Sequence, residues 1–487
     1  MDKKQIQFDQ ELGNNIPLSL GQLQAQLIQP ESSFNSIAIF EDWVNGYADH
    51  EGGELVEVTI PEKVVWGNQL SIMTLQKGEV AYVLPTPPGF LEFYEEFGIL
   101  ENRQQVIELQ HQLGHKKSIG FPYSNLVSIA SKQQYSLSEH DGVIVTYPCP
   151  YIRNLIESMN GKALQCSNAF YSNNKSEFRR NSQRYGYPIP KGMEINTLED
   201  LEVAVDRFSS CDKVWLKLSR GSGGTTVIPI ESPLNIQVLK SNICQLKGVV
   251  NRSFEDNAFQ LESLEKIWHR HSELPSSHQL ILEENIDFHI NGCNILLISS
   301  DGRYNVPFYS RKILGESGEY LGGSEFKPSQ EMLEKLNACM GLIAQYCYED
   351  LNYYGMVGVD FMLTKQGSEE NIIIGELNAR APGTGVAYML ACKLNAPFWL
   401  SVTVTSPIPL LTMDDFQEVF QDFIRRDLEK GMIIPQAFRC IYSLDKSGSR
   451  EVVYSSRSVR ILICGSEMEL CNHILEAIKA RGIKVGF

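Results

Sequence analysis

Disulfide frameworks and membrane segments are the first features that this sequence lacks. Its 487 residues include 11 cysteines, an odd and scattered number without a CxxC pair, which excludes a dense disulfide framework and favours reduced thiols. No apolar run approaches the roughly 18 residues that a membrane-spanning helix needs. The polar start, MDKKQIQFDQ, has no apolar signal-peptide core. We therefore expect a cytoplasmic protein without a membrane partner.

Clustered positive charge is also missing. Lysine and arginine number 43 against 59 aspartate and glutamate residues, and the net charge is −16. Binding to a nucleic-acid backbone depends on clustered Lys and Arg, so nucleic acid is excluded as the main partner. A hydrophobic content of 43% and a charged content of 21% are those of an ordinary globular chain.

The first third of the chain has no GxGxxG dinucleotide-binding motif, but strand and helix patterns alternate along it. We expect a lead-in helix near 16–27. Short apolar runs then predict strands at 36–40, 56–60, 80–84 and 143–146. Two further stretches, 90–97 and 103–113, predict helices. Alternation of this kind predicts a parallel α/β sheet. We expect a Rossmann-like α/β domain over residues 1–165.

The most informative stretch runs from Gly355 to Gly385 and reads as two apolar strands joined by a polar turn. Asp360 lies within the first strand, and Glu376 and Asn378 follow the apolar run of the second. A carboxylate in a core strand is costly unless it is paired or binds a cation, and two carboxylates with an amide oxygen suit magnesium. An exposed hairpin with surface acids paired to Arg380 or Lys365 is the equally weighted alternative.

Two lysines upstream of this hairpin lie in unusual settings. Lys175 begins a predicted helix that Asn173 or Asn174 caps and that ends near Gly186. Lys217 lies inside an apolar strand, which is unusual for an ammonium group unless an anion binds there. A glycine-rich segment follows it, whose backbone N–H groups can approach phosphate oxygens or form a simple hairpin turn; it contains Gly221, Ser222, Gly223, Gly224 and Thr225.

Taken in order, these pieces resemble the ATP-grasp superfamily over about residues 168–400. The resemblance implies that Lys175 and Lys217 bind ATP phosphates beneath the glycine-rich lid and that Glu283, Glu284, Ile286 and Asp287 bind the adenosine. It further implies that Asp360, Glu376 and Asn378 hold Mg²⁺ and that Arg380 adds positive charge beside the phosphates. A basic residue should face the transferred phosphate. Arg311 and Lys312 both fit, and we favour Arg311 slightly because strand alternation lets only one point inward.

The resemblance and the residue patterns together predict the domain organisation. We expect a pre-ATP-grasp α/β domain at 1–165, an ATP-grasp domain at 166–405 with a lid at about 200–290, and a small C-terminal α+β region at 406–487. Within these, we expect a helix capped by Ser329, a loop at 381–386, a helix at 413–430 and a capping box formed by Ser466 and Glu469. The segment 315–323 is either a substrate loop or a simple turn.

The implied function is that of a ligase. A carboxylate would attack the γ-phosphate of ATP with Mg²⁺ bound, and an amine, on an amino acid or a peptide, would capture the acyl phosphate. Two alternatives stay open: a carboxylase-type subunit that activates bicarbonate, and an ATP-binding regulatory protein without catalysis. Because dimers are common among such proteins, a homodimer is a possible assembly.

Overall fold

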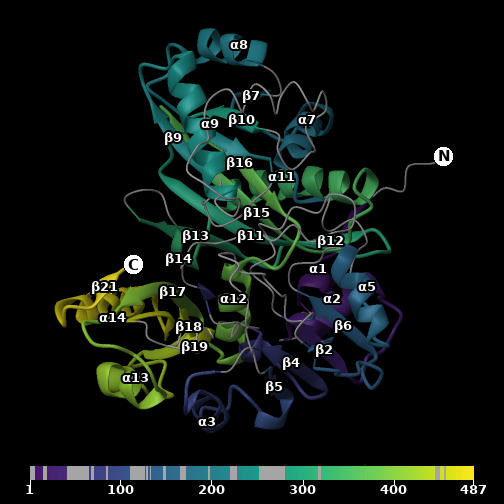
Figure 1. Ribbon diagram of the computed structural model, residues 1–487, viewed down its shortest axis with the longest axis vertical. Helices are drawn as coiled ribbons and strands as arrows, with labels where there is room; N and C mark the ends of the chain where they lie inside the picture. Colours follow the sequence, from purple (N-terminus) through teal and green to yellow (C-terminus); the bar gives the residue numbers. More distant parts are fainter. Residues whose placement is uncertain are drawn as a thin grey trace.

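The structure is a computed structural model, and it describes residues 6–14, 19–40, 65–66, 71–83, 86–109, 127, 130–131, 133–145, 150–164, 172–195, 198–219, 227–251, 280–315, 320–367, 369–444, 450–453 and 457–486. Within these ranges, no helix combines the length and the apolarity that crossing a membrane requires. Figure 1 shows the four-stranded lid sheet at one end of the long axis, the front sheet and the C-terminal strands at the other, and the central sheet between them.

The front of the chain forms a parallel sheet, as the sequence predicts. Its strands pair in the order β5-β4-β2-β6 and comprise β2 (Ile37–Phe40), β4 (Glu79–Val83), β5 (Val106–Glu108) and β6 (Gly142–Val145). Alternate residues of β2 enter different cores: Ile37 and Ile39 pack towards helix α2 (Leu20–Ile28), whereas Phe40 packs with Ile156 of α5 (Pro150–Ser158). The α/β prediction is therefore confirmed, whereas the predicted strand at 56–60 lies outside the described residues.

The helix predicted at 103–113 is wrong for the residues that are described. A capping box between Asn102 and Gln105 closes a single turn of 3-10 helix, Arg103–Gln105, and the chain then extends as β5. The physical reason is that Val106 and Ile107 are β-branched, so they favour a strand. The helix predicted at 90–97 is present as α3 (Phe90–Glu96).

The lid sheet is antiparallel, with the strand order β7-β10-β8-β9. Its strands are β7 (Gly192–Ile195), β8 (Lys213–Leu218), β9 (Val227–Glu231) and β10 (Leu280–Glu284). Helices α8 (Leu198–Phe208) and α9 (Ile236–Asn251) cover one face by packing on Leu216, Leu280 and Leu282. Because side chains alternate along a strand, Lys217 and Glu283 lie on the opposite face.

The predicted hairpin forms the centre of the molecule. Strands β15 (Gly355–Gln366) and β16 (Glu369–Asn378) pair antiparallel, and β15 also pairs along its length with β11 (Ile290–Ile298). The central sheet continues beyond β11 through β13 (Tyr309–Leu314), β14 (Tyr320–Glu325) and β17 (Phe398–Thr405), while β12 (Arg303–Asn305) and β1 (Gln7–Phe8) extend it past the end of β11. Of the segment 315–323, residues 320–323 therefore belong to a strand.

Helix α11 (Gln330–Glu349) covers one face of this hairpin. Ser329 caps it, as predicted, by accepting a hydrogen bond from the backbone N–H of Met332. Its apolar side chains pack with those of β11 and β15, among them Leu336, Met340, Ile343, Val357 and Val359. The apolar residues of β15 face α11. Because side chains alternate along a strand, Asp360 lies on the other face.

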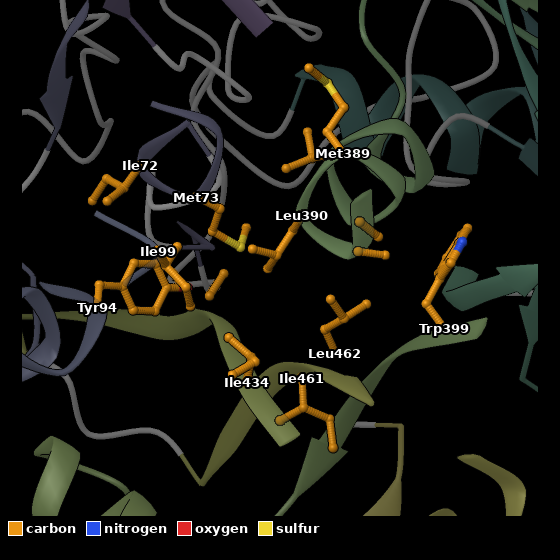
Figure 2. Packing of buried hydrophobic residues seen from close by; sticks show 14 of the residues in the cluster. Ile72, Met73, Tyr94, Ile99, Met389, Leu390, Trp399, Ile434, Ile461 and Leu462 are labelled. Atoms are coloured by element: carbon orange, nitrogen blue, oxygen red, sulfur yellow. The ribbon is translucent and has the colours of Figure 1, made fainter. Parts of the chain in front are cut away.

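The C-terminal strands continue the central sheet. Strand β20 (Ser458–Gly465) pairs with β17 and with β18 (Met432–Leu444), and β19 (Arg450–Val453), β21 (Lys484–Val485) and β3 (Val65–Trp66) add to its edges. Helix α12 (Gly383–Lys393) lies between these strands and the front sheet. Figure 2 shows Leu390 of α12 between Ile72 and Met73 on one side and Ile434 and Leu462 on the other; Met389 of the same helix belongs to the same buried cluster. One core therefore joins the front and the end of the chain.

Two predictions in the C-terminal part need correction. The helix expected at 413–430 ends early: α13 covers Met413–Phe420, with Gln421–Phe423 forming a 3-10 turn. The capping box at Ser466 and Glu469 is wrong, because α14 (Met468–Ala480) begins after Glu467 without a side-chain cap. Leu470 and Cys471 instead pack against Gly465 at the end of β20, so packing sets where the helix begins. Gly482, with a φ of +80°, follows the end of this helix.

Candidate active site

A β-bulge aligns the acidic side chains of the hairpin. Phe361 pairs with Ile374, but Asp360 pairs with Glu376 and Gly358 pairs with Asn378, so Gly375 is the extra residue of β16. If Gly375 were paired in a regular register instead, Asp360 would face Gly375, and Glu376 would point to the other face of the sheet. The bulge therefore gathers Asp360, Glu376 and Asn378 on one face. Sequence analysis missed its role, although a glycine inside a strand is the usual signal of a bulge.

Lys312, and not Arg311, faces these acids. Lys312 on β13 forms an ion pair with Asp360, and both side chains are largely buried, whereas Arg311 is exposed. The slight preference for Arg311 is therefore corrected. Burial alone would lower the pKa of Lys312, but Asp360, with smaller contributions from Cys293 and Glu376, outweighs it and raises the pKa to about 12. Lys312 is thus a permanent positive charge beside the hairpin.

Lys175 supplies a second cation to the same face. It is the first residue of α7 (Lys175–Tyr185), and its Nζ lies 2.9 Å from Oε1 of Glu376. Burial would raise the pKa of Glu376, but Lys175, Arg380 and Lys312 outweigh it and hold the pKa below its usual value. The backbone N–H of Lys175 donates to the Ser219 carbonyl over 2.8 Å, which brings the beginning of α7 to the end of β8.

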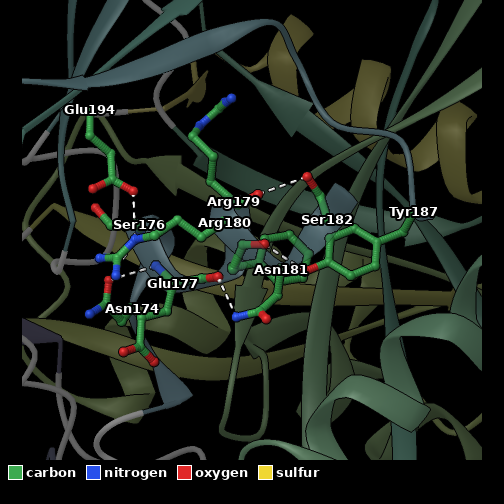
Figure 3. A network of polar contacts seen from close by, with 10 residues as sticks. Asn174, Ser176, Glu177, Arg179, Arg180, Asn181, Ser182, Tyr187 and Glu194 are labelled. Carbon is green, nitrogen blue, oxygen red and sulfur yellow. Dashed lines mark hydrogen bonds and ion pairs between the residues drawn. The ribbon is translucent and has the colours of Figure 1, made fainter. Parts of the chain in front are cut away.

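Asn174 and Asn173 fix the position of this helix. The side chain of Asn174 accepts hydrogen bonds from the backbone N–H groups of Ser176 and Glu177 over 3.0 and 3.2 Å (Figure 3). Asn is among the residues preferred at this position of a helix, so Asn174 is the cap of α7. Asn173 accepts from the backbone N–H of Ala379 over 2.8 Å. That contact ties α7 to the end of β16, and sequence analysis did not find it.

Arg380 lies two residues after Asn378, one of the residues predicted to bind a metal, and folds back onto it. Its guanidinium donates to the side-chain oxygen of Asn378, and its backbone N–H donates to the Asn378 carbonyl over 2.7 Å. The structure thus brings together six of the predicted residues, namely Lys175, Lys312, Asp360, Glu376, Asn378 and Arg380.

The lid contributes a separate cluster of charges. Lys217 on β8 and Arg179 on α7 both form ion pairs with Glu283, which is buried on β10. Glu283, predicted to bind adenosine, therefore also neutralises a predicted phosphate-binding lysine. Burial would raise the pKa of Glu283, but Lys217 and Arg179 outweigh it and lower the pKa. The glycine-rich loop with Gly221, Ser222, Gly223, Gly224 and Thr225 lies outside the described residues.

The other residues predicted to bind adenosine lie at the end of β10. Glu284 accepts a hydrogen bond from the backbone N–H of Lys191 over 2.9 Å, and the backbone N–H of Glu284 donates to the Lys191 carbonyl over 2.9 Å. Ile286 is half-buried, and Asp287 is exposed. The side chain of Glu284 thus links the end of β10 to the residue before the edge strand β7. The roles of these three residues towards a ligand stay predictions.

The segment 381–386, expected to be a loop, contains the first turn of α12. Pro382 precedes the helix without a side-chain cap, and Gly383, Thr384 and Gly385 are its first residues. A Cβ on Gly323 would lie 2.7 Å from Thr384 Cγ2, and a Cβ on Gly358 would lie 3.0 Å from Pro382 Cβ. These glycines therefore allow the N-terminus of α12 to approach β14 and the hairpin.

The acid and amide oxygens of the hairpin fit a hard divalent cation. Asp360 and Glu376 face one another across the hairpin, with Asn378 beside them, and magnesium prefers such oxygen ligands. The described residues contain no cluster of three or more His, Cys, Asp or Glu side chains that could hold a metal. A bound Mg²⁺ would therefore need further ligands, and substrate phosphates and water are its usual ones.

Comparison with known proteins identifies the fold. No protein-family model and no curated protein matches the chain. Among solved structures, biotin carboxylase from Campylobacter jejuni has a TM-score of 0.54 at 12% identity, covering 93% of this chain and 92% of that one. An ADP complex of PurK, N5-carboxyaminoimidazole ribonucleotide synthetase, has a TM-score of 0.52 at 12% identity, covering 91% and 96%.

A third solved structure has a similar likeness. It is the biotin carboxylase domain dimer of the Hydrogenobacter thermophilus 2-oxoglutarate carboxylase, in complex with MgADP, ADP and bicarbonate. Its TM-score is 0.51 at 12% identity, and the match covers 94% of this chain and 91% of that one. At such low identity these likenesses show the fold, and they extend over nearly the whole chain.

Proposed function

Because the chain has the ATP-grasp fold, we propose that it is an ATP-dependent ligase. It activates a carboxylate as an acyl phosphate, with ADP as the other product, and joins the acyl group to the amine of an amino acid or peptide. The observation that carries the proposal is the face shared by β13, β15 and β16. There, two carboxylates and an amide oxygen lie with Lys175, Lys312 and Arg380.

In this proposal, the acidic and the basic side chains of this face have different roles. Asp360, Glu376 and Asn378 would hold Mg²⁺, whose chemistry is to neutralise the charge of the phosphates during transfer. Lys175 and Lys312 would leave their carboxylate partners and bind phosphate oxygens, and Arg380 would stabilise the negative charge that develops on the transferred group. None of these residues has to act as a nucleophile.

Exclusion of water is the other requirement, because an acyl phosphate hydrolyses. The lid strands carry Lys217 towards the same region, since Ser219 contacts the backbone of Lys175. Closure of the lid over the nucleotide would shield the reacting groups. The proposal thus assigns Lys217 to a phosphate and Glu283 to the adenine side of the nucleotide.

The test is nucleotide and phosphate release from ATP and Mg²⁺ across a panel of amino acids, singly and in pairs, with bicarbonate as a separate arm. ADP formation that requires both a carboxylate and an amine supports the ligase. ADP formation stimulated by bicarbonate alone supports the carboxylase alternative. The bicarbonate arm is included because two of the similar solved structures are biotin carboxylases. Release of AMP contradicts the acyl-phosphate mechanism. Tight ATP binding without turnover supports the regulatory alternative.

Cytoplasmic location, the absence of nucleic-acid and membrane partners and a homodimer stay predictions. The domain boundaries at 165/166 and 405/406 stay predictions as well. Gel filtration with light scattering would measure the assembly directly.

A further inference from the structure

One buried carboxylate in the lid neutralises two cations that come from different elements. Glu283 is only 6% exposed. Its Oε1 contacts the Arg179 guanidinium of α7, and its Oε2 contacts the Lys217 ammonium of β8. Both cations are themselves largely buried, with 12% and 19% of their side chains exposed. The triad has an excess of one positive charge.

Arg179 is held in place by contacts that do not involve Lys217. Its Nη1 donates to the Pro190 carbonyl over 3.0 Å. Its guanidinium packs against Gly192, where a Cβ would lie 2.8 Å from Cζ of Arg179. The planar guanidinium can satisfy a carbonyl and a carboxylate together. Figure 3 shows Arg179 and Arg180 on α7, with Arg180 paired to Glu194 of the lid.

Lys217, in contrast, lies where its partner can change. It is near the end of β8, which meets the beginning of α7 through the contact between Ser219 and Lys175. Its ammonium sits on a flexible four-carbon stem. Transfer of Lys217 to an anionic ligand would therefore be a side-chain movement that leaves the lid sheet unchanged.

That transfer would leave Glu283 buried with only one cation. A buried carboxylate without a partner is strongly unfavourable. Without Arg179, the departure of Lys217 would leave Glu283 as such an unpaired charge, so the lysine would stay on it. With Arg179 in place, Glu283 keeps a charge-assisted hydrogen bond throughout. The second cation therefore determines how easily the first one leaves.

We propose that Arg179 is a positioning residue for nucleotide binding: it holds the charge of Glu283, so that Lys217 is released to bind a nucleotide phosphate. The inference rests on the proposed function only in so far as the chain binds ATP or ADP. Arg179 itself contacts no phosphate in this assignment. Its effect must therefore depend on the presence of both Glu283 and a phosphate.

The experiment measures ADP and adenosine binding to the full chain by calorimetry. R179M should weaken ADP binding by about tenfold or more, because Lys217 stays on Glu283. Adenosine, which has no phosphate for Lys217, should lose less than about threefold. R180M is the matched control, since Arg180 is the next residue of the same helix and pairs with Glu194; its ADP affinity should stay within about twofold.

A double-mutant cycle separates positioning from a general structural role. In the E283Q background no charge remains to be neutralised, so adding R179M should change ADP affinity by less than about threefold. R179K should restore part of the lost ADP affinity. Should R179M fail to fold, R179Q carries the same comparison.

Unchanged ADP affinity in a folded R179M or R179Q variant overturns the inference. So does a loss of ADP and adenosine binding by the same factor, or an undiminished effect of R179M in E283Q. ADP binding by the parent chain without ligase turnover overturns the proposed function and leaves this inference standing. A parent chain that binds no ADP overturns both.

Discussion

Arg311 and Lys312 are neighbours with the same charge, yet the strand gives them different surroundings. Lys312 lies against Asp360 among buried side chains, whereas Arg311 points to solvent on the other face of β13. Charge alone does not separate two such residues in a sequence. Which of the two side chains approaches the acids depends on which face of the sheet carries Asp360. The pairing of the strands in the tertiary fold sets that face.

This pair supplies a matched test of the site. K312M should lower the rate of ADP formation by about 100-fold or more, because it removes a preorganised positive charge from the reacting group. R311M removes the same charge from the solvent side and should change the rate by less than about threefold. Steady-state kinetics on both variants makes the comparison. Equal effects of the two substitutions would contradict the assignment.

The acidic residues of the hairpin can be tested in the same way. D360N and E376Q should each lower ADP formation by about 100-fold or more and weaken Mn²⁺ binding measured by electron paramagnetic resonance. Glu370 on the same hairpin pairs with His289, 2.9 Å away at the rim, and E370Q is the control, expected to stay near parent activity. If E376Q bound Mn²⁺ as well as the parent does, Glu376 would not be a metal ligand.

The charge of Glu283 should also appear in the pH dependence of stability. Its pKa in the folded chain lies below the ordinary value of 4.5 because Lys217 and Arg179 outweigh burial. The stabilisation is therefore complete above about pH 4.5 and is lost as the pH falls through the lower folded-state pKa. Urea unfolding of the parent and of E283Q should differ at pH 7 and converge on acidification. A difference independent of pH would contradict this.

Among the elements, the bulged hairpin is the one on which the site depends. Gly375 shifts the register by one residue, so Glu376 and Asn378 share a face with Asp360. A Cβ on Gly375 would meet its nearest atom, Met362 Cε, at 3.6 Å, an ordinary contact. The site therefore does not require the lack of a side chain at this position.

Substitution of Gly375 therefore has a definite expected result. G375A keeps the bulge and should retain activity within about threefold of the parent. Activity assays with circular dichroism on this variant would separate loss of the site from loss of the fold. A folded but inactive G375A variant would show that the site depends on the glycine itself.

Prediction from sequence succeeded where an element carries its own local signal. The hairpin, the Asn174 cap and the Ser329 cap follow from turn and capping residues. It failed where packing decides: α12 begins at Gly383 because glycines on β14 and β15 admit its first turn, and α14 begins without the expected capping box. The counterion Arg179 was also missed, since its partner Glu283 lies 104 residues away.

The whole molecule has one core that connects the beginning of the chain with its end. Residues of the front sheet, α12 and the C-terminal strands belong to a single buried cluster (Figure 2). Sequence patterns described the C-terminal part as a small α+β region, and they gave no sign that β20 pairs with β17. Pairings between strands so far apart depend on complementary packing, which local periodicity does not encode.

The shared core predicts cooperative unfolding. Leu462 is fully buried in this cluster, so L462A should lower the free energy of unfolding by about 2–5 kcal/mol. Because the core is shared, amide exchange should accelerate in both β20 and the front strand β2. L411A, at an exposed leucine, is the control and should change stability by less than about 0.5 kcal/mol. Faster exchange confined to the C-terminal strands would argue for an independent unit.

Lys175, Lys312 and Lys217 each form an ion pair with a carboxylate of the site. A divalent cation that arrives alone must displace ammonium groups, and a phosphate that arrives alone must draw lysines away from acids. When both arrive together, each lysine gains a phosphate, Asp360 and Glu376 gain the metal, and Glu283 keeps Arg179. Under the proposed function, the site would therefore respond weakly to inorganic phosphate or to free magnesium, and strongly to a nucleotide that carries its metal with it.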